Sequence, residues 1–236
     1  MSPLLAILFG AALLVPAIAI AVPVHEMGHA AAAYLLGDRS VRYFHYFSPD
    51  PRRFLEPVGT LSIFLALVGW GRRVPIQSNR INTTAKKVLY ELGGPAANLA
   101  VALVVGVLVR VMFQGGFHVA YVDPSGIVFG IIYVITFLNL SLFAFNLLPI
   151  PGLDGWNIVE NLLRRRFPRF FFEVHVRQRE IWAGLVLILI LFQFLNRINL
   201  LNPIMSPFFE PASLISTGTC LAYGIPYVNA LFPCLL

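Results

Sequence analysis

The sequence predicts an all-α polytopic membrane protein, with about five transmembrane helices and a short re-entrant or interfacial β-hairpin. Of its 236 residues, 58% are hydrophobic and only 12% are charged, whereas a soluble domain carries about a quarter charged residues. The hydrophobic residues gather in long runs that suit the interior of a bilayer. We therefore expect a single membrane-embedded domain over residues 1–236, with its core at 4–160 and C-terminal spans within 181–236.

The expected spans follow from the lengths of the apolar runs. A helix rises about 1.5 Å per residue and a bilayer core is about 30 Å thick, so a span needs about 20 residues. We assign spans to residues 4–36, 84–112, 127–148, 181–195 and 212–236, the last interrupted by glycines and prolines. The run at 58–70 is too short to cross, and its β-branched residues and flanking glycines favour a hairpin packed on the helices.

The charge distribution indicates topology. The formal net charge is +6, and nine of the 17 Lys and Arg residues lie between positions 37 and 87. Six more lie between 155 and 180, while residues 113–126 contain none. This asymmetry follows the positive-inside rule and places both basic blocks on the cytoplasmic side. We therefore expect the basic residues to lie beside a lipid bilayer, and we expect no nucleic acid as a partner.

The first expected span contains the sharpest motif, His25-Glu26-Met27-Gly28-His29. Histidines at positions i and i+4 share one helix face and can bind one metal ion, and the intervening Glu can act as a general base. The competing interpretation is a polar helix face with paired histidines. Ionisable residues inside a membrane span cost about 2.5–3.5 kcal/mol each, so they are rarely without a role, and this favours the metal.

A catalytic zinc site needs three protein ligands and one open position. The remaining histidines and the carboxylates are the candidates for the third ligand. If the first and third spans both run towards the cytoplasm, the histidine pair and Asp154 lie at the same side of the membrane, whereas His118 and Asp123 lie at the other. His45 and His175 fall in the basic blocks, where solvated or interfacial positions are expected. Asp154 is therefore the preferred third ligand.

Two motifs together identify a family. The motif His25–His29 is followed by Asn146-Leu147-Leu148-Pro149-Ile150-Pro151-Gly152-Leu153-Asp154-Gly155, with Gly94-Pro95-Ala96-Ala97-Asn98 between them. This combination, within residues 15–160, resembles the site-2 protease family of intramembrane zinc metalloproteases, in a short form without a PDZ or CBS region. The resemblance implies one Zn²⁺ per chain bound by His25, His29 and Asp154, with Glu26 activating water.

Three further polar residues have alternative roles. Asn98 could donate a hydrogen bond to substrate or to a developing oxyanion, or it could serve helix packing beside small residues. Asn146 could contact substrate, or bond only to backbone carbonyls that Pro149 leaves free. Glu91 could pair with Lys87, which lies four residues earlier on the same helix face.

The function that we expect is hydrolysis of peptide bonds in or near transmembrane segments of membrane-protein or peptide substrates. A helical substrate must unwind first, because its carbonyls are occupied by hydrogen bonds, and the expected hairpin could pair with the extended segment. The alternatives are a non-proteolytic metal-binding membrane protein and a substrate-binding scaffold. We expect a multi-pass protein of a bacterial or archaeal cell membrane, with its active site towards the cytoplasmic side.

Overall fold

The structure is a computed structural model that describes residues 3–48, 50–66, 71–77, 79–117, 123–191 and 201–218. The regular secondary structure of these residues is helical. Among these residues there is no β-strand, and an isolated antiparallel bridge joins Leu55 to Gly71. The prediction of a mostly helical protein is confirmed. The elements are α1 (Pro3–Leu35), α2 (Ser40–Tyr43), η1 (Pro51–Arg53), α3 (Pro57–Ala66), α4 (Thr84–Gln114), α5 (Pro124–Asn146), α6 (Asp154–Leu163), α7 (Pro168–Val176), α8 (Gln178–Leu191) and α9 (Leu201–Thr217).

Three of the described helices are long and apolar enough to cross a membrane: the Leu8–Leu35 part of α1, and all of α4 and α5. They correspond to the first three expected spans. Helix α8, at the expected fourth span, has 14 residues, and residues 192–195 lie outside the described chain. Helix α9 enters the expected fifth span, of which residues 219–236 are not described. The count of five spans remains a prediction.

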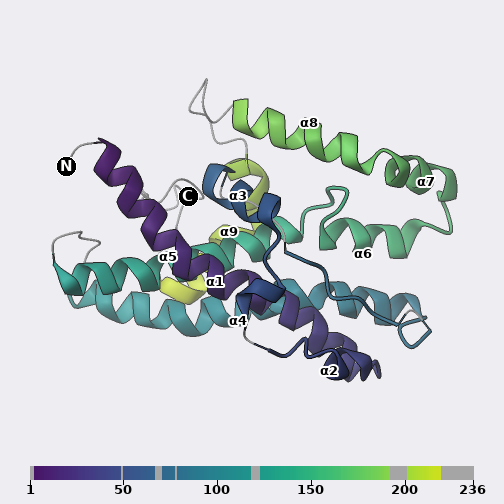
Figure 1. The fold of residues 1–236 in the computed structure, drawn as a ribbon, viewed down its shortest axis with the longest axis horizontal. Helices are drawn as coiled ribbons and strands as arrows, with labels where there is room; N and C mark the ends of the chain where they lie inside the picture. The colour runs from purple at the N-terminus through teal and green to yellow at the C-terminus, as the bar shows by residue number, and fades with distance from the viewer. Residues whose placement is uncertain are drawn as a thin grey trace.

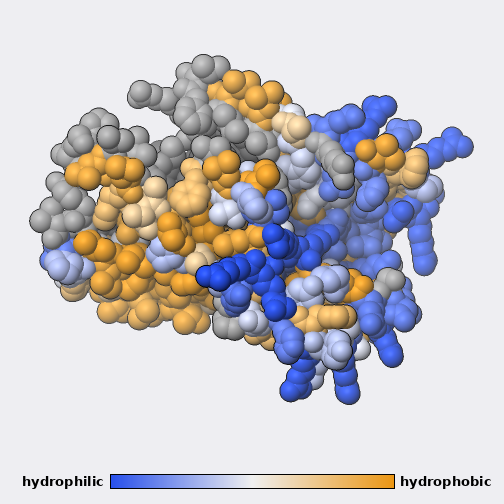
Figure 2. Space-filling model, in the orientation of Figure 1, coloured by the Kyte–Doolittle hydropathy of each residue, from blue (hydrophilic) through white to orange (hydrophobic). Residues whose placement is uncertain are grey.

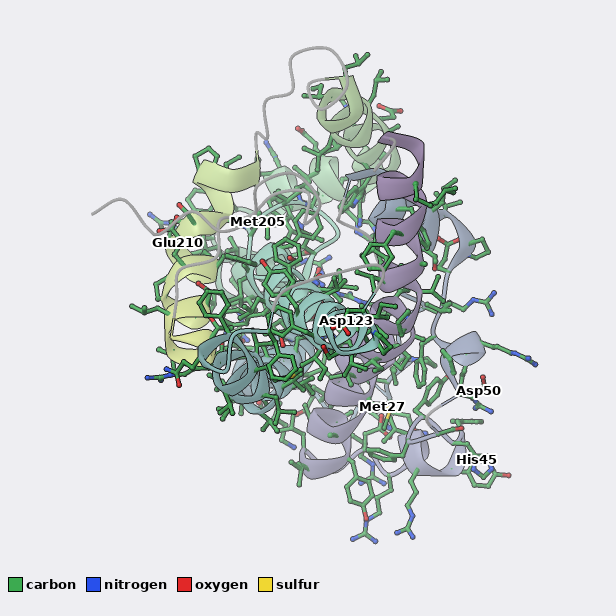
Figure 3. The ribbon with its side chains drawn as sticks, turned by 90° about the vertical axis from the view of Figure 1, so that its left-hand side faces the viewer. Met27, His45, Asp50, Asp123, Met205 and Glu210 are labelled. Atoms are coloured by element: carbon green, nitrogen blue, oxygen red, sulfur yellow. The ribbon has the colours of Figure 1, made fainter. Side chains whose placement is uncertain are left out.

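Helix α5 lies at the centre of the bundle. Helices α1, α4 and α9 all pack against it, and α1 and α9 also pack against α4 (Figures 1 and 3). In the apolar 18-residue stretch of each helix, 67% is buried in α5 but only 22% in α4. The side of α9 that faces the bundle carries Met205 and Phe209, both fully buried, and the Phe209 ring lies 5.5 Å from that of Phe137 on α5.

The expected β-hairpin is not confirmed, because its described part is helical: Pro57–Ala66 form α3, and residues 67–70 lie outside the described chain. Proline favours the first turn of a helix, where its missing N–H is not needed. The Glu56 carboxylate accepts the N–H of Gly59 at 2.5 Å, as a capping side chain does. The helix therefore satisfies its own backbone groups, which a short hairpin beside lipid cannot do.

The two ends of the helices differ in polarity, as Figure 2 shows. The hydrophobic end includes a row of exposed residues on the C-terminal half of α4, namely Val104, Val107, Leu108 and Val111. The hydrophilic end includes α6, α7 and the start of α4, where Arg164, Arg165, Arg166 and Arg169 are exposed. The basic residues of α6, of α7 and of the start of α4 therefore lie at one end of the bundle, the end at which α1 and α5 finish (Figures 1 and 2).

Backbone hydrogen bonds hold the extended segment 71–77 against the rest of the structure. The N–H of Arg72 donates to the Phe54 carbonyl at 2.6 Å, and the Val74 carbonyl accepts from the Tyr90 hydroxyl at 3.0 Å. The N–H of Gln77 donates to Oδ2 of Asp38 at 2.7 Å. This segment lies beside the histidine motif, and its side chains contribute to the site described next.

Candidate metal centre

The two histidines of the motif meet on one face of α1. His25 and His29 are one helical turn apart, and their Nε2 atoms lie 3.2 Å from each other. Their exposed fractions are 7% and 1%. A helix puts positions i and i+4 on the same face, so the 3.6-residue repeat alone brings both rings to one point.

Asp154 completes a triangle with these rings. Its Oδ2 atom lies 3.1 Å from Nε2 of His25 and 3.2 Å from Nε2 of His29. This oxygen is buried, and the described residues supply it with no hydrogen bond. Zinc bonds of about 2.0–2.1 Å in tetrahedral geometry separate neighbouring donor atoms by about 3.3 Å. The three donor atoms therefore fit a zinc ion that binds to one side of their triangle.

Both rings are oriented by hydrogen bonds on their other nitrogen. Nδ1 of His25 lies 2.7 Å from Oδ1 of Asn98, and Nδ1 of His29 lies 2.9 Å from the Tyr90 carbonyl. Both partners are acceptors, so each neutral ring carries its proton on Nδ1 and presents the Nε2 lone pair to the metal position. Such bonds fix the tautomer and orientation of metal-binding histidines.

Asn98 is fully buried, and both the N–H groups and the oxygen of its side-chain amide have partners. Its Nδ2 donates to the Ala21 carbonyl at 3.0 Å and to Oδ1 of Asn139 at 2.8 Å, while its oxygen faces His25. Both N–H bonds of the amide are therefore made within the bundle, and they hold the oxygen in place. Contact between Asn98 and a substrate stays a prediction, and it would require one of these bonds to be given up.

Small residues on α4 make room for the histidines. A Cβ on Gly94 would lie 2.4 Å from Nε2 of His29 and 2.7 Å from Nε2 of His25. Real Cβ atoms do not approach that closely, so any larger residue here would displace the rings. The glycine in the Gly-Pro-x-x-Asn element thus allows α4 to lie directly beside the metal position.

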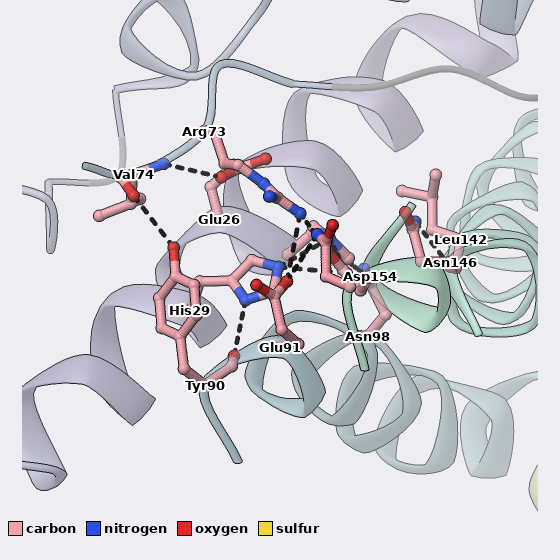
Figure 4. A network of polar contacts seen from close by, with 12 residues as sticks. Glu26, His29, Arg73, Val74, Tyr90, Glu91, Asn98, Leu142, Asn146 and Asp154 are labelled. Carbon is pink, nitrogen blue, oxygen red and sulfur yellow. Dashed lines mark hydrogen bonds and ion pairs between the residues drawn. The ribbon is translucent and has the colours of Figure 1, made fainter. Parts of the chain in front are cut away.

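Glu26 lies beside the triangle, with 4% of its surface exposed. Its Oε2 atom accepts the backbone N–H of Val74 at 3.3 Å, so the 71–77 segment holds this carboxylate (Figure 4). Glu26 also lines the cavity that contains the histidines and Asp154. The one carboxylate of the motif is therefore available to a molecule that enters this cavity.

Arg73 connects Asp154 to a second buried carboxylate. Its Nη2 donates to Oδ1 of Asp154 at 2.9 Å and to Oε2 of Glu91 at 3.2 Å (Figure 4). Burial opposes the charge of the guanidinium, but the carboxylates of Glu91 and Asp154 raise the pKa of Arg73 above its ordinary value. Asn157 Nδ2 also donates to Oε2 of Glu91, at 3.0 Å. Among the described ion pairs, the partner of Glu91 is therefore Arg73 and not Lys87.

A cavity of about 1060 Å³ opens at the triangle. The histidine motif and Arg73 line one side, and α6, α7 and α8 contribute the other, including Trp156, Phe172 and Trp182. Asn146 also lines it, and its Nδ2 donates to the Leu142 carbonyl at 2.9 Å. The cavity is large enough to receive several side chains of a polypeptide.

The remaining sequence candidates lie elsewhere. His45 and Asp50 lie on the side of the molecule opposite α9 (Figure 3). Asp123 caps α5 by accepting the N–H of Gly126 at 2.9 Å, and His118 lies outside the described residues. His175 lines the same cavity as the triangle, but it does not belong to the group that could hold a metal ion. Of the histidines and carboxylates in the described chain, those grouped closely enough to hold a metal ion are His25, His29 and Asp154.

Residues 117–192, which include Asp154, match the family described as "Peptidase family M50". This part of the chain is therefore similar to peptidase family M50. M50 is the site-2 protease family, so the family resemblance expected from the sequence motifs is confirmed. This match and the three helices that are long and apolar enough to cross a membrane both indicate a membrane protein.

This chain has two relatives that carry similar names. It is 35% identical over 141 residues to "Putative zinc metalloprotease YwhC" of Bacillus subtilis, a match that covers 59% of this chain and 64% of the relative. It is 37% identical over 147 residues to "Putative zinc metalloprotease Rip2" of Mycobacterium tuberculosis, covering 59% and 53%. The chain thus spans less than two thirds of either relative. No solved structure matches it significantly.

Three residues around the candidate metal centre had no role in the sequence interpretation, namely Arg73, Tyr90 and Asn157. Tyr90 contributes a backbone carbonyl, which any residue type could supply, so no sequence signal marks it. Arg73 lies in the first basic block, where the charge pattern does not distinguish one arginine from the others.

Proposed function

We propose that this protein is an intramembrane zinc metalloprotease that hydrolyses peptide bonds in or near the transmembrane segments of its substrates. The observation that carries the proposal is the buried triangle of His25, His29 and Asp154, with Glu26 beside it at the end of apolar helices. The names of the relatives from Bacillus subtilis and Mycobacterium tuberculosis support the same chemistry.

One zinc ion per chain is the proposed cofactor, held by Nε2 of His25, Nε2 of His29 and Oδ2 of Asp154. When bound, zinc supplies Lewis acidity, which polarises a scissile carbonyl and lowers the pKa of water. Asn98 and the Tyr90 carbonyl keep the two imidazoles in the tautomer that this requires. We assign Asn98 to this positioning role, because both of its N–H groups are already donated.

Glu26 is the proposed general base and acid. Its carboxylate takes a proton from the attacking water and then gives that proton to the leaving amine, as a buried Glu beside a metal site can do. The N–H of Val74 keeps Oε2 in a fixed place. A neutral Gln at this position retains the shape and loses the ability to accept the proton.

Substrate recognition is proposed to occur in the cavity next to the triangle. A transmembrane helix must unwind there, because each of its interior carbonyls accepts a hydrogen bond from within the helix. Asn146 lines this cavity and is the proposed side chain for contact with the unwound backbone. Trp156, Phe172 and Trp182 offer apolar and aromatic surface to the side chains of a membrane segment.

We further propose that the chain is a single membrane-embedded domain of a bacterial or archaeal cell membrane, with about five spans and its active site towards the cytoplasm. The basic residues of α6 and α7 and the site lie at the same end of the bundle. Single cysteines at Arg166 and Ser125, in a protein without Cys220 and Cys234, test this in sealed vesicles. A membrane-impermeant maleimide should label position 166 only from the cytoplasmic face. The reverse pattern would overturn the orientation.

The decisive experiment compares wild type with Glu26→Gln, each purified in detergent with its zinc content measured and then incubated with a transmembrane peptide substrate. We expect about one zinc per chain in both proteins, and cleavage only by wild type. Glu173→Gln, which changes an exposed carboxylate on α7, is the matched control and should cleave normally. Zinc bound without cleavage of any membrane peptide by wild type would favour the non-proteolytic alternatives. A folded wild type without zinc would refute the proposal.

A further inference from the structure

The two carboxylate oxygens of Asp154 have different partners. Oδ2 faces the histidine pair, whereas Oδ1 accepts a hydrogen bond from Nη2 of Arg73 at 2.9 Å. A carboxylate can bind a metal through one oxygen or through both. When a guanidinium is hydrogen-bonded to one carboxylate oxygen, the other oxygen is the one that can bind the metal.

We propose that Arg73 is a positioning residue that restricts Asp154 to ligation through Oδ2 and thereby keeps a coordination position open for reactants. This inference rests on the proposed zinc site and assigns a new residue to it. A catalytic zinc needs such an open position, and a second Asp154 oxygen would compete for it. Arg73 acts through Asp154 and takes no part in proton transfer.

The guanidinium is itself held in place from two other elements. Its Nη2 donates to Oε2 of Glu91 on α4, and Asn157 on α6 donates to the same oxygen at 3.0 Å. Asn157 lies one turn after Asp154 on α6, so the network joins the α6 N-terminus, α4 and the 71–77 segment. The Arg73 side chain is 48% exposed and Glu91 is largely buried, at 10%. The buried acid therefore anchors an arginine whose other atoms face the cavity.

A role in charge balance alone makes the opposite prediction. Arg73 lies near three carboxyl groups, those of Glu26, Glu91 and Asp154. If Arg73 only balanced charge, its removal would take a cation away from the zinc and strengthen zinc binding. If Arg73 orients Asp154, its removal weakens zinc binding, because partners that orient a metal ligand are worth about 10- to 100-fold in affinity.

The test measures zinc affinity by competition with a chelator, on the full chain in detergent, for wild type, Arg73→Ala, Arg73→Lys and Arg72→Ala. We expect a loss of about 10- to 100-fold for Arg73→Ala and partial recovery with Lys, which can still donate to Oδ1. Arg72, whose side chain is exposed, is the matched control and should bind zinc as wild type does. Thermal unfolding without zinc verifies that each variant is folded.

A second measurement uses cobalt in place of zinc. Absorption by cobalt(II) falls as its coordination number rises, so a freed Oδ1 should lower the visible absorbance per bound cobalt in Arg73→Ala. If Arg73→Ala does not fold, the spectrum of Arg73→Lys is compared with that of Arg72→Ala. Zinc binding as tight as wild type, or an unchanged cobalt spectrum, would overturn the inference while leaving the protease proposal intact. A wild type that binds neither metal would instead refute the proposed function.

Discussion

Gly28 on α1 and Gly93 on α4 lie with their backbones in direct contact. A Cβ on Gly28 would come within 2.4 Å of the Gly93 carbonyl oxygen, and a Cβ on Gly93 within 2.6 Å of the Gly28 carbonyl oxygen. Small residues allow membrane helices to approach this closely. Because Gly28 belongs to the histidine motif, this crossing also brings His25 and His29 to their partners on α4.

Substituting Gly28→Ala should separate the two helices. A new methyl group would meet backbone atoms of Gly93 and the Cβ of Ala97, none of which can rotate away. We therefore expect a loss of about 1–3 kcal/mol of stability. The zinc content should fall as well, because both histidines depend on groups of α4 for their orientation. Thermal unfolding in detergent and metal analysis measure these two effects.

Gly184→Ala on α8 is the matched control for that substitution. Apart from its own helix backbone and chain neighbours, no atom of the described residues lies within 4 Å of a Cβ at this position. Ala is favoured over Gly inside a helix by about 1 kcal/mol. This variant should be at least as stable as wild type and should bind zinc normally. A Gly28→Ala variant that behaves in the same way would contradict the close crossing.

Replacing Asn98 by Ala should weaken zinc binding while leaving the ligands in place. The Nδ1–H of His25 loses its acceptor, so its ring is no longer held in one orientation and tautomer. Loss of such a partner lowers metal affinity or activity by about 10- to 100-fold. Asn161→Ala is the control, since the Asn161 amide donates to the carbonyl of Asn157 within the same helix. Equal zinc affinities of the two variants would argue against the positioning role of Asn98.

Zinc should stabilise the folded protein by mass action. A ligand present at 100 times its dissociation constant adds about 2.7 kcal/mol to the free energy of unfolding. We therefore expect a chelator to lower the unfolding temperature and added zinc to restore it. The double variant His25→Ala and His29→Ala should show no dependence on zinc. A zinc-dependent shift that survives in this variant would place the metal elsewhere.

The ionisation of Asp38 should make the free energy of unfolding depend on pH under acidic conditions. Burial disfavours its charge, but hydrogen bonds from Ser40 and the N–H of Gln77 lower the pKa of Asp38 below its ordinary value. A carboxyl group with a lowered pKa stabilises the fold above its unfolded pKa of about 3.9, and this contribution is lost as pH falls through the folded pKa. Asp38→Asn should remove that part of the acid destabilisation.

The same variant should also weaken the attachment of the 71–77 segment. Oδ2 of Asp38 accepts the N–H of Gln77 at 2.7 Å, and an amide nitrogen at that place leaves the N–H without an acceptor, at about 1–3 kcal/mol. Unfolding temperatures at neutral pH measure this loss. Asp50→Asn, at an exposed carboxylate that caps the short helix η1, is the control and should change little. No difference between the two variants would contradict the role of Asp38.

The sequence was sufficient to group the three candidate metal ligands, for two separate physical reasons. The repeat of the α-helix puts His25 and His29 on one face wherever the helix lies. The direction of successive spans puts Asp154 at the same end of the bundle, and the structure brings its carboxylate to the two Nε2 atoms. Neither argument needed contacts between distant residues to be known.

The surroundings of that triangle could not be predicted in the same way. The spacing rule for helix surfaces suggested Lys87 as the partner of Glu91, but Glu91 faces the inside of the bundle, where Arg73 and Asn157 reach it. The β-branched residues after Pro57 indicated a strand, yet a capped helix satisfies the backbone without a neighbour. In both cases the outcome depends on which distant segment packs alongside, and local patterns do not contain that information.

The ligands of the triangle are separated by more than a hundred residues of chain, and two further membrane-crossing helices lie between His29 and Asp154. A ribosome that has delivered the histidine motif has therefore made only part of the centre. The nascent chain has to insert α4 and α5 before the carboxylate can arrive. The proposed hydrolytic activity therefore cannot begin before the chain has been synthesised through the start of α6, after both α4 and α5.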